Sequence, residues 1–455
     1  KDDEGTVSMV TKGALEEMLM ISSRVEYQGE VTPLTDAIRS EILAEVGQLN
    51  KQGLRVLGIG YKTDIQEGYS YTVKDEKDMI LTGYLAFLDP PKPSAAPAIK
   101  ALLEHGVKTK ILTGDNEKVT QAICEKVGLD VEEILLGADI EQMSDEQLAE
   151  AVEKVTVFAK LSPDQKARII LQLKNNGHGV GYMGDGINDA PSMKVADVGI
   201  SVDTAVDIAK ETADVILLDK DLMVLETGIV EGRKVYANMT KYIKMTVSSN
   251  FGNIFSLLVA SIFLPFLPMA PVHLIVLNLV YDLSCVALPF DNVDQDFLKQ
   301  PHTWEAKSIT RFMVWMGPIS SIFDILTFIF LYFIIVPLVT GYHYVHGSES
   351  ALQFIILFQT GWFIESMWSQ TMVIHMLRTA KVPFVQSRPA WLVILTTLIA
   401  AIFVTSLPYG PLVNILRLAP LGLPYFLFLI CIIFLYMFSV TVIKNFYIKK
   451  YKEWL

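Results

Sequence analysis

The sequence predicts two kinds of structure in one chain: α/β domains with a Rossmann-like rhythm, followed by an all-α membrane domain of six transmembrane helices. The chain has 455 residues, too many for one ordinary domain, and 51% of them are hydrophobic, with a mean hydropathy of +0.37. Up to about residue 240 the sequence is charged and alternates strand-like with helix-like segments. Beyond that point apolar runs of roughly 20 residues recur, which is long enough to cross a bilayer.

Residues 1–82 are expected to form part of a small α/β unit. Residues 6–11 resemble a strand, apolar residues recur at helical spacing between 34 and 49, and residues 54–60 form a second strand. The charged and polar positions between these segments suit the exposed face of such a unit.

In residues 83–225 strand-like segments alternate with helix-like segments, which predicts a parallel sheet with helices between its strands. Parallel sheets carry catalytic loops at the carboxyl ends of their strands, and Thr113, Asp185 and Asn188 fall there. The expected strands are 107–112, 155–159, 180–183, 198–202 and 215–218, and the helix after the first of them is expected over 117–127.

The octet GDGINDAP at residues 184–191 follows an apolar strand. Glycines at 184 and 186 let the backbone turn tightly and approach a ligand. Asp185, Asn188 and Asp189 place three oxygen donors within five residues, the chemistry that suits Mg²⁺ beside a phosphoryl group. The alternative is a polar turn, in which Asp and Asn serve turn geometry alone.

Six apolar segments are expected to span a membrane. The first continues a helix that begins near Asp221 and would act as a rod between the α/β part and the bilayer. The expected spans are about 244–266, 272–290, 312–339, 351–376, 390–407 and 422–443.

Basic residues predict the orientation of these spans, because Lys and Arg concentrate in cytoplasmic loops. Only Arg417 falls in the loops opposite the α/β part, so both ends of the chain are expected in the cytosol. The basic tail suits an anionic lipid surface, although topology alone would also explain it. The basic residues on the α/β side are Lys307, Arg311, Arg378, Lys381, Arg388, Lys444, Lys449 and Lys450.

Polar groups in hydrocarbon are costly and usually line a pathway or pair with one another. Asn250 and Asn253 lie three residues apart on the first span, and Asn278 and Asp282 lie four apart on the second. If the two faces meet, they form an oxygen-rich cation cavity between these spans. Hydrogen bonding between helices is the alternative for the asparagines.

Two further acids, Asp324 and Glu365, lie in later spans. They could pair across helices, hold a basic partner or serve as an ion exit, and structural pairing is favoured.

Charge and cysteine content exclude other classes of protein. The net charge of −12 lies mainly in the α/β part, which argues against nucleic acid as a partner. Cys124, Cys285 and Cys431 are far apart, so neither a disulfide framework nor a zinc site is indicated.

Four motifs in order resemble those of P-type ATPases, in the haloacid dehalogenase superfamily. GDGINDAP is similar to the hinge motif of this family, and Thr113-Gly114-Asp115 to its TGD motif. LDPPK at 88–92 resembles DPPR, and SPDQK at 162–166 resembles the segment with the phosphate-site lysine. The resemblance implies the carboxyl-terminal part of a nucleotide-binding domain at 1–82, a phosphorylation domain at 83–225, and a stalk with six membrane helices at 226–455.

The resemblance also implies roles for individual residues, with ATP and Mg²⁺ as cofactors. Lys12, Gly13 and Arg55 match nucleotide-binding positions, with the lysine at a turn near the adenosine part of ATP. Asp185 and Asp189 would hold Mg²⁺. The implied catalytic residues are Thr113, Gly114, Asp115, Lys166 and Asn188.

The nucleophile of the family is absent from this sequence. The family phosphorylates an aspartate in a DKTGT segment upstream of the nucleotide domain, and no such segment occurs here. We therefore expect the missing amino-terminal part of the same pump as a partner, with a degenerate relative as the alternative. A homodimer is compatible with the sequence.

The membrane motifs indicate the transported ion. The order of Asn250, Asn253, Asn278 and Asp282 is similar to the ion-binding helices of calcium pumps, but those pumps have glutamate where Asn253 stands. Fewer carboxylates suggest an ion that keeps some of its water, such as Mg²⁺. The sequence around these residues resembles that of the bacterial magnesium-transporting branch, which implies Mg²⁺ import across a bacterial plasma membrane. The alternatives are a Ca²⁺ or proton pump, a membrane-tethered phosphatase of the same superfamily, and a non-catalytic regulatory subunit.

Overall fold

The computed structural model describes the chain except residues 1–6, 64, 66–69, 89, 220 and 455 and the side chain of Glu349. Asp89 of the LDPPK segment therefore lies outside the described residues. The chain divides into two compact units, Lys1–Gly228 and Ile229–Leu455, called here the α/β unit and the helical unit.

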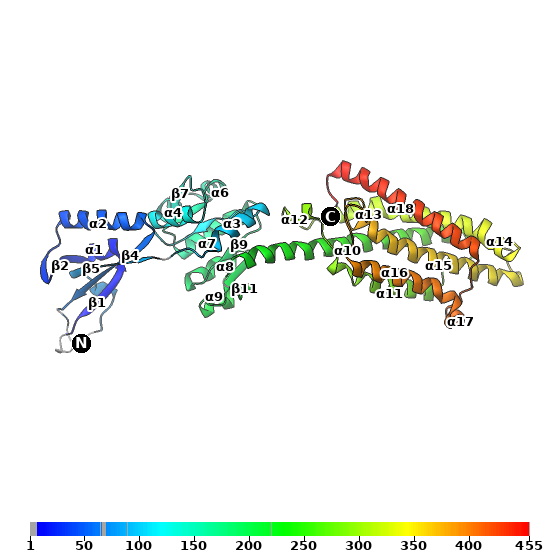
Figure 1. The fold of residues 1–455 in the computed structure, drawn as a ribbon, viewed down its shortest axis with the longest axis horizontal. Coiled ribbons are helices and arrows are strands. Elements are labelled where there is room, and N and C mark those ends of the chain that lie inside the picture. The colour runs from blue at the N-terminus through cyan, green and yellow to red at the C-terminus, as the bar shows by residue number, and fades with distance from the viewer. Residues whose placement is uncertain (1–6, 64, 66–69, 89, 220, 455) are drawn as a thin grey trace. The chain divides into compact units, whose positions relative to one another are not determined.

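The α/β unit begins with a five-stranded mixed sheet (Figure 1). Its elements are β1 (Met9–Ala14), α1 (Leu15–Ile21), β2 (Ser22–Tyr27), β3 (Glu30–Pro33), α2 (Asp36–Lys51), β4 (Leu54–Lys62), η1 (Val73–Asp75) and β5 (Met79–Leu88). The strand order is β1-β4-β5-β2-β3. Leu15, Met18 and Leu19 of α1 pack with Val46 of α2 and Leu81 of β5 in the core. The predicted helix and second strand are confirmed, whereas the first described strand begins three residues after the predicted start.

Two three-stranded parallel sheets follow in the same unit, with orders β6-β8-β7 and β11-β10-β9. The strands are β6 (Ile111–Leu112), β7 (Ile134–Leu136), β8 (Val157–Ala159), β9 (Gly181–Met183), β10 (Val198–Val202) and β11 (Val215–Leu217). The helices are α3 (Ala95–Glu104), α4 (Glu117–Lys126), α5 (Gly137–Gln142), α6 (Asp145–Lys154), α7 (Pro163–Asn175), η2 (Ile187–Asp189), α8 (Ala190–Val195) and α9 (Asp207–Thr212). The predicted parallel pairing is confirmed, but the strands form two ladders. The strand predicted at 107–112 is only two residues long, since the amide of Val107 bonds back to Leu102 of α3.

The helical unit is a bundle of long helices (Figure 1). Five helical segments are long and apolar enough to cross a membrane: Met223–Phe263, Pro271–Phe290, Ala306–Thr340, Trp391–Tyr409 and Leu423–Tyr451. The elements are α10 (Met223–Phe263), α11 (Pro271–Cys285), η3 (Leu288–Phe290), α12 (Gln295–Leu298), α13 (Ala306–Phe330), η4 (Leu331–Ile335), α14 (Val336–Thr340), α15 (Glu349–Leu377), α16 (Trp391–Ser406), η5 (Leu407–Tyr409), α17 (Val413–Leu416) and α18 (Leu423–Tyr451). The continuous helix expected from near Asp221 through the first span is confirmed by α10, whose start is capped by Asp221 Oδ1, 2.9 Å from the amide of Met223.

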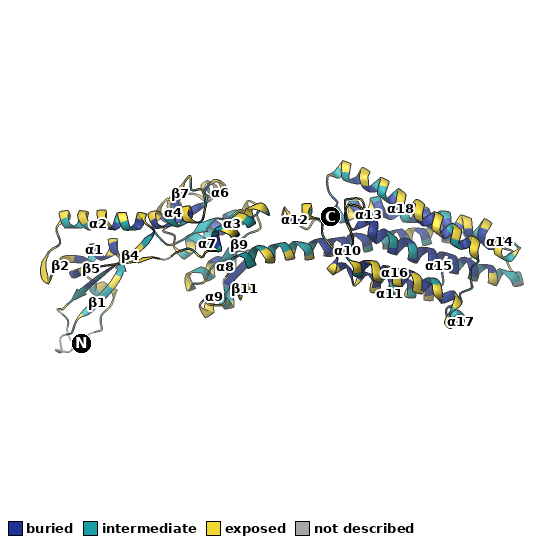
Figure 2. Ribbon diagram, in the orientation of Figure 1, coloured by how far each residue is buried: buried dark blue, intermediate teal, exposed yellow. Residues whose placement is uncertain are grey.

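Helix α15 occupies the position of the fourth predicted span but is not among the five apolar segments. Gln353, Gln359, Glu365 and Gln370 interrupt its apolar sequence. It contacts α11, α13, α16 and α18, and most of its residues are buried (Figure 2). A helix surrounded by other helices can carry polar groups because their partners come from protein rather than lipid.

Helices α10 and α13 approach closely at two glycines. A Cβ atom at Gly252 would overlap Ser320 Oγ, and one at Gly317 would lie 2.5 Å from the ring of Phe251. Ser321 Oγ donates to the carbonyl of Gly252 across the contact, at 3.0 Å. Small residues at such crossings let helix backbones meet, as is typical of membrane bundles.

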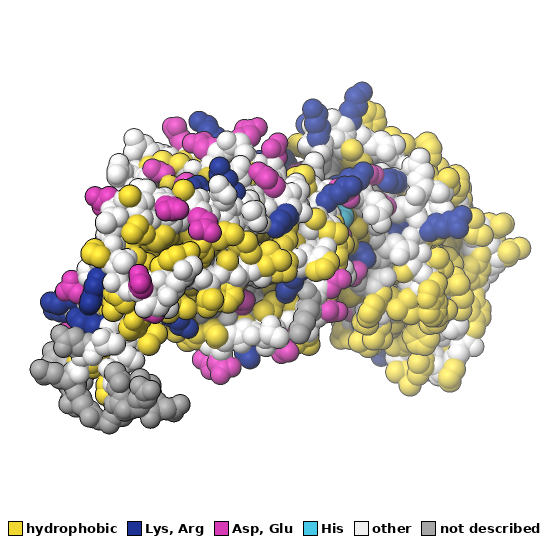
Figure 3. Space-filling model, turned by 60° about the vertical axis from the view of Figure 1, so that its left-hand side comes forward, with side chains coloured by type: hydrophobic (Ala, Val, Ile, Leu, Met, Phe, Trp, Pro, Cys, Tyr) yellow, Lys and Arg dark blue, Asp and Glu magenta, His cyan; other side chains and the backbone are white. Residues whose placement is uncertain are grey.

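The outward faces of the long helices are apolar. Large hydrophobic side chains are exposed along α10, α11, α13, α16 and α18, including Ile262, Leu283, Ile322, Ile402 and Phe434. Figure 3 shows hydrophobic side chains over much of the visible face of the helical unit, whereas most of the visible acidic side chains lie on the α/β unit. An apolar surface of this extent suits contact with lipid.

A cluster of buried charged residues connects α10 with the end of α15 at one end of the helical bundle. Asp291 Oδ2 lies 2.8 Å from both Lys241 Nζ of α10 and Arg378 Nε at the end of α15. Its other oxygen accepts from the amide of Ala390, at 3.1 Å. All three charged side chains are at most 1% exposed. Removing the carboxylate would leave two cations buried without their counter-charge.

We predict that Asp291→Ala destabilises the helical unit by about 3–5 kcal/mol, because it leaves Lys241 and Arg378 buried and uncompensated. The midpoint of thermal denaturation of the purified protein in detergent measures this loss. Asp296→Ala is the matched control, since its 67% exposed carboxylate pairs with Lys381 at the surface, where solvent screens the pair and its loss should leave the midpoint nearly unchanged. Equal midpoints for the two variants would contradict the prediction.

Candidate functional site

The octet GDGINDAP lies directly after β9, as the sequence predicts. The amide of Gly184 continues the parallel ladder by donating to the carbonyl of Ile200, at 3.1 Å, and Ser201 Oγ donates to the carbonyl of Gly184, at 3.0 Å. Residues 187–189 form the short helix η2, and α8 follows immediately. The octet is therefore anchored to β10 at its start and to a helix at its end.

Asp189 is the most constrained side chain of the octet. Its Oδ1 atom lies 2.9 Å from Lys166 Nζ and 2.7 Å from the hydroxyl of Tyr182, and Oδ2 accepts from the amide of Gly186 at 3.2 Å. Burial alone would raise the pKa of Asp189, but the hydrogen bonds from Lys166 and Tyr182 and the charge of Lys166 outweigh it and lower this pKa. Asp189 is thus held as an anion in the octet.

Gly184 is required by this arrangement. A Cβ atom at Gly184 would overlap the Asp189 side chain, with the carboxyl carbon only 2.7 Å away. Any larger residue would displace Asp189 and, with it, the partner of Lys166. The glycine therefore fixes the geometry of the charged pair as well as the turn.

Asp185 and Asp189 differ in their capacity to bind Mg²⁺. Asp189 has its oxygens engaged with Lys166, Tyr182 and Gly186. Asp185 is exposed, and its carboxylate makes no hydrogen bond or ion pair with the described residues. Asn188 is exposed as well. No group of three His, Cys, Asp or Glu side chains that could hold a metal occurs among the described residues, so a metal here would need ligands from a phosphate, water or another segment.

Thr113, Gly114 and Asp115 form a turn after β6. Thr113 Oγ1 accepts from the amide of Asp115 at 3.1 Å and lies 3.2 Å from Asp115 Oδ2. The turn is tied to the loop after β8, because the carbonyls of Thr113 and Asp115 accept from the amides of Leu161 and Lys160 at 3.0 and 2.8 Å. Gly114 faces solvent.

Helix α7 connects the loop after β8 to the octet. Ser162 caps α7 in a capping box with Gln165, and Pro163 occupies the first turn. This start directs Lys166 toward Asp189. The loops after β6, β8 and β9 are therefore linked in series by hydrogen bonds, although no hydrogen bond or ion pair among the described residues joins the Thr113 turn to Asp185.

The expected nucleotide residues lie on β1 and β4, which pair antiparallel. Lys12 and Gly13 lie within β1 opposite Ile59 and Gly58, so the lysine is on a strand and not at the turn that the family resemblance implies. Arg55 Nη2 lies 2.8 Å from Asp115 Oδ1. This ion pair brings one expected nucleotide residue into contact with the turn after β6.

The four expected membrane ligands do not share one enclosed cavity. Asn250, Asn278 and Asp282 are exposed on the surface of the helical unit. Asn253 is half-buried and lines a cavity with Ser248, Ser320, Asp324 and Gln370. The cation cavity between α10 and α11 therefore stays a prediction, and in the described chain the outward faces of Asn250, Asn278 and Asp282 are uncovered.

Asp324 and Glu365 are both buried, and Trp362 of α15, three residues before Glu365, donates to Asp324 Oδ1 at 2.9 Å, which favours the predicted structural pairing across α13 and α15. Sequence reasoning missed Tyr182 and Ser256, which bond to Asp189 and Asp324. Tyr182 could have been noticed as a hydroxyl two residues before the octet in an apolar strand. Ser256 carries no signal of its own, because serine is common in membrane helices.

Comparison with known proteins covers most of the chain. A family model described as "Cation transporting ATPase, C-terminus" matches residues 266–446, and one described as "P-type ATPase, cytoplasmic domain N" matches residues 1–94. The first match lies in the helical unit and the second over the five-stranded sheet.

Curated relatives agree with these matches. The chain is 50% identical over 444 residues to a magnesium-transporting ATPase, P-type 1, of Escherichia coli (strain K12), covering 97% of this chain and 48% of the relative. It is 49% identical over 451 residues to the same-named protein of Salmonella typhimurium (strain 14028s), covering 99% and 49%. A calcium-transporting ATPase of Bacillus subtilis (strain 168) is 34% identical over 71% of this chain and 37% of its own length. The chain spans about half the length of the magnesium-transporting relatives, and it belongs to the P-type ATPase family.

Proposed function

We propose that this chain is part of an ATP-driven cation pump that forms an aspartyl phosphate and imports Mg²⁺. The observation that carries the proposal is the octet itself, in which Gly184 and the Lys166–Asp189 pair fix a loop that presents the exposed Asp185. A phosphoryl transfer site needs a cation for the developing charge and donors for the phosphate oxygens. Asp185 suits the first need, and Thr113 and Lys166 suit the second.

The nucleophile comes from a segment beyond this chain. Strands β6 and β9 are edge strands of the two parallel sheets, and the turn of Thr113 and the loop of Asp185 leave their carboxyl ends. A strand from the remaining length of the pump would pair with both edges and carry its DKTGT aspartate to the two loops. On this proposal residues 83–225 complete a phosphorylation domain only with that strand.

ATP and Mg²⁺ are the cofactors of the proposed reaction. Mg²⁺ is commonly held by one or two carboxylates together with phosphate oxygens, and the solvent-facing Asp185 fits that pattern. The ion neutralises charge on the transferred phosphoryl group. Asp189 and Lys166 act together as a rigid charged pair, so Asp189 orients the lysine rather than binding the metal, while Gly114, Asp115 and Asn188 shape the surrounding loops. Residues 1–82, through Lys12, Gly13 and Arg55, bind the nucleotide.

The membrane domain comprises six spans, with α15 as the fourth. Its burial by four neighbouring helices supports this, since a central helix needs less apolar surface than one facing lipid. Basic residues of the helical unit gather at one end, where Arg311 contacts Glu453 and Lys444 donates to the carbonyls of residues 376, 379 and 381. This end faces the bacterial cytosol with the α/β unit, next to the anionic lipid of the plasma membrane.

Mg²⁺ is the proposed cargo. The relatives named for magnesium transport share half of their aligned residues with this chain, whereas the calcium-transporting relative shares a third. Asn250, Asn278 and Asp282 face outward where further helices of the pump would cover them, and with Asn253 they form the cation cavity. One carboxylate among amide oxygens suits an ion that keeps part of its water shell.

We predict that Asp185→Asn in the complete pump slows phosphoenzyme turnover by about a hundredfold or more, because the charge that holds the cation is lost. Incorporation of labelled phosphate from ATP, followed by a chase, measures turnover. Asp207→Asn in the same unit is the matched control, since its carboxylate is 94% exposed on α9. Unchanged turnover in Asp185→Asn would remove the assigned role.

We predict that Asp282→Asn abolishes the stimulation of ATP hydrolysis by free Mg²⁺, because the proposed cavity loses its only carboxylate. Hydrolysis is measured at a fixed concentration of the Mg²⁺–ATP complex while free Mg²⁺ varies, which separates cargo from cofactor. Asp296→Asn should keep the wild-type dependence. The same free-Mg²⁺ dependence in both variants would count against the cavity.

A further inference from the structure

Two carboxyl groups are buried together inside the helical unit. Asp324 of α13 is 3% exposed and Glu365 of α15 is 1% exposed, and Trp362, three residues before Glu365 on α15, donates to Asp324 Oδ1 at 2.9 Å and so brings this part of α15 against Asp324. Burying two ionised carboxylates side by side in a membrane bundle is strongly unfavourable, because each charge loses its hydration and repels the other. A proton shared between the two groups removes this cost.

Hydrogen-bond donors around the pair are neutral. Ser256 Oγ lies 2.6 Å from Asp324 Oδ2, and Trp362 Nε1 donates to Asp324 Oδ1 at 2.9 Å. The other titratable groups that face the pair are the hydroxyls of Tyr425 and Tyr436 on α18. No lysine, arginine or histidine interacts with either carboxyl group among the described residues. The counter-charge for the pair must therefore be a proton or a bound cation.

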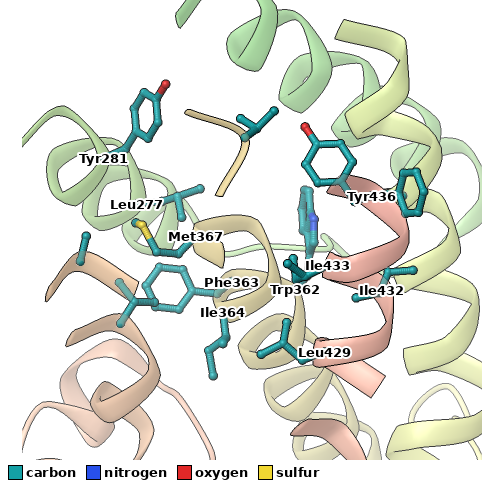
Figure 4. Close-up of a cluster of buried hydrophobic side chains, with 14 of the residues drawn as sticks. Leu277, Tyr281, Trp362, Phe363, Ile364, Met367, Leu429, Ile432, Ile433 and Tyr436 are labelled. Atoms are coloured by element: carbon teal, nitrogen blue, oxygen red, sulfur yellow. The ribbon is translucent and has the colours of Figure 1, made fainter. Parts of the chain in front are cut away.

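Apolar residues close off the surroundings of the pair. Figure 4 shows Trp362 between α15 and α18, with Ile433 and Tyr436 nearby. Trp362 also packs edge-on against Phe328 of α13, at 4.7 Å between ring centroids. These contacts exclude bulk water from the acid pair on this side.

A small cavity adjoins Asp324. Its volume is about 20 Å³, and its lining includes Ser248, Asn253 and Gln370. Gln370 and Ser248 are buried, at 6% and 3% exposure. Gln370 Nε2 and Ser248 Oγ have no hydrogen-bond partner among the described residues. A polar cavity of about 10–15 Å³ or more can hold a water molecule, which would satisfy such groups.

We propose that Asp324 and Glu365 form a proton-binding site, which holds one proton between the two carboxyl groups and exchanges it through a water molecule in the adjoining cavity. In this exchange the O–H bond of the carboxyl group breaks as the cavity water accepts the proton, and the reverse transfer restores it. The cavity is too small for a hydrated Mg²⁺ ion, which keeps several waters in an octahedral shell. The inference does not depend on the proposed pumping activity.

Infrared spectroscopy of the complete protein in lipid vesicles tests the site directly. A protonated carboxyl group has a C=O stretching band separate from that of carboxylate, and this band shifts when deuterium replaces the proton. We expect wild-type protein at neutral pH to show a band that is absent from the double variant D324N/E365Q, and to shift it after transfer to D₂O. The control D296N, at the exposed surface, should keep the band.

The cavity has its own test. Q370L replaces the unpartnered amide with an apolar group that cannot hold the cavity water, so the band should remain while its shift in D₂O becomes several times slower. A merely structural role for Gln370 would not change the exchange rate. The wild-type measurement does not require any variant to fold.

Three results would overturn the inference. Absence of the band in wild-type protein at neutral pH would mean that both groups are ionised and balanced by a cation. A band that does not shift after long exposure to D₂O would mean a trapped proton. A band equal in wild type and D324N/E365Q would mean that other residues carry it. None of these results depends on ATP hydrolysis, so they are distinct from failure of the proposed function.

Discussion

The ion pair between Lys166 and Asp189 is the interaction on which the α/β unit's candidate site depends. It connects the start of α7 to the octet after β9, and it exists only because position 184 carries no side chain. Lys166 and Asp189 are both largely buried, at 12% and 14% exposure, so the pair is screened less by solvent than a surface salt bridge. A lysine fixed in this way can meet a phosphate without the entropic cost of ordering its long side chain. The remaining carboxylate of the octet, Asp185, is left facing solvent, where we propose that a metal ion binds.

The helical unit depends on a different constraint, the need to satisfy polar groups away from water. Helix α15, which is not among the five apolar segments, lies among four other helices, and its Glu365 is buried by protein rather than exposed to lipid. At one end, Asp291 balances Lys241 and Arg378 in a buried cluster. Helix α10 takes part in both arrangements, through Lys241 and Ser256. A movement of α10 would therefore reach the charge cluster and the acid pair together.

Much of this could be predicted from the sequence, because the decisive features are local. The octet, the strand before it and the continuous helix α10 depend on residues close in the chain. The Lys166–Asp189 pair was not predictable from spacing, and sequence reasoning placed Asp189 with the metal ligands because an aspartate looks the same whether it binds a cation or a lysine. Likewise, hydropathy gives the length of a helix but not which side faces lipid, so the exposure of Asn250, Asn278 and Asp282 in the described chain could not be predicted. The Arg55–Asp115 ion pair joins residues sixty positions apart, and the sequence pattern could not predict it.

Movement of Mg²⁺ into sealed vesicles that contain the complete pump tests the central claim most directly. The vesicles would be oriented by the accessibility of the α/β unit, loaded with a magnesium-sensitive dye and supplied with ATP on the side of that unit. The account predicts ATP-dependent movement of Mg²⁺ toward the side of the α/β unit, accompanied by an acid-stable phosphoenzyme. Hydrolysis of ATP without any movement of Mg²⁺, or equal movement of Ca²⁺ in its place, would contradict it.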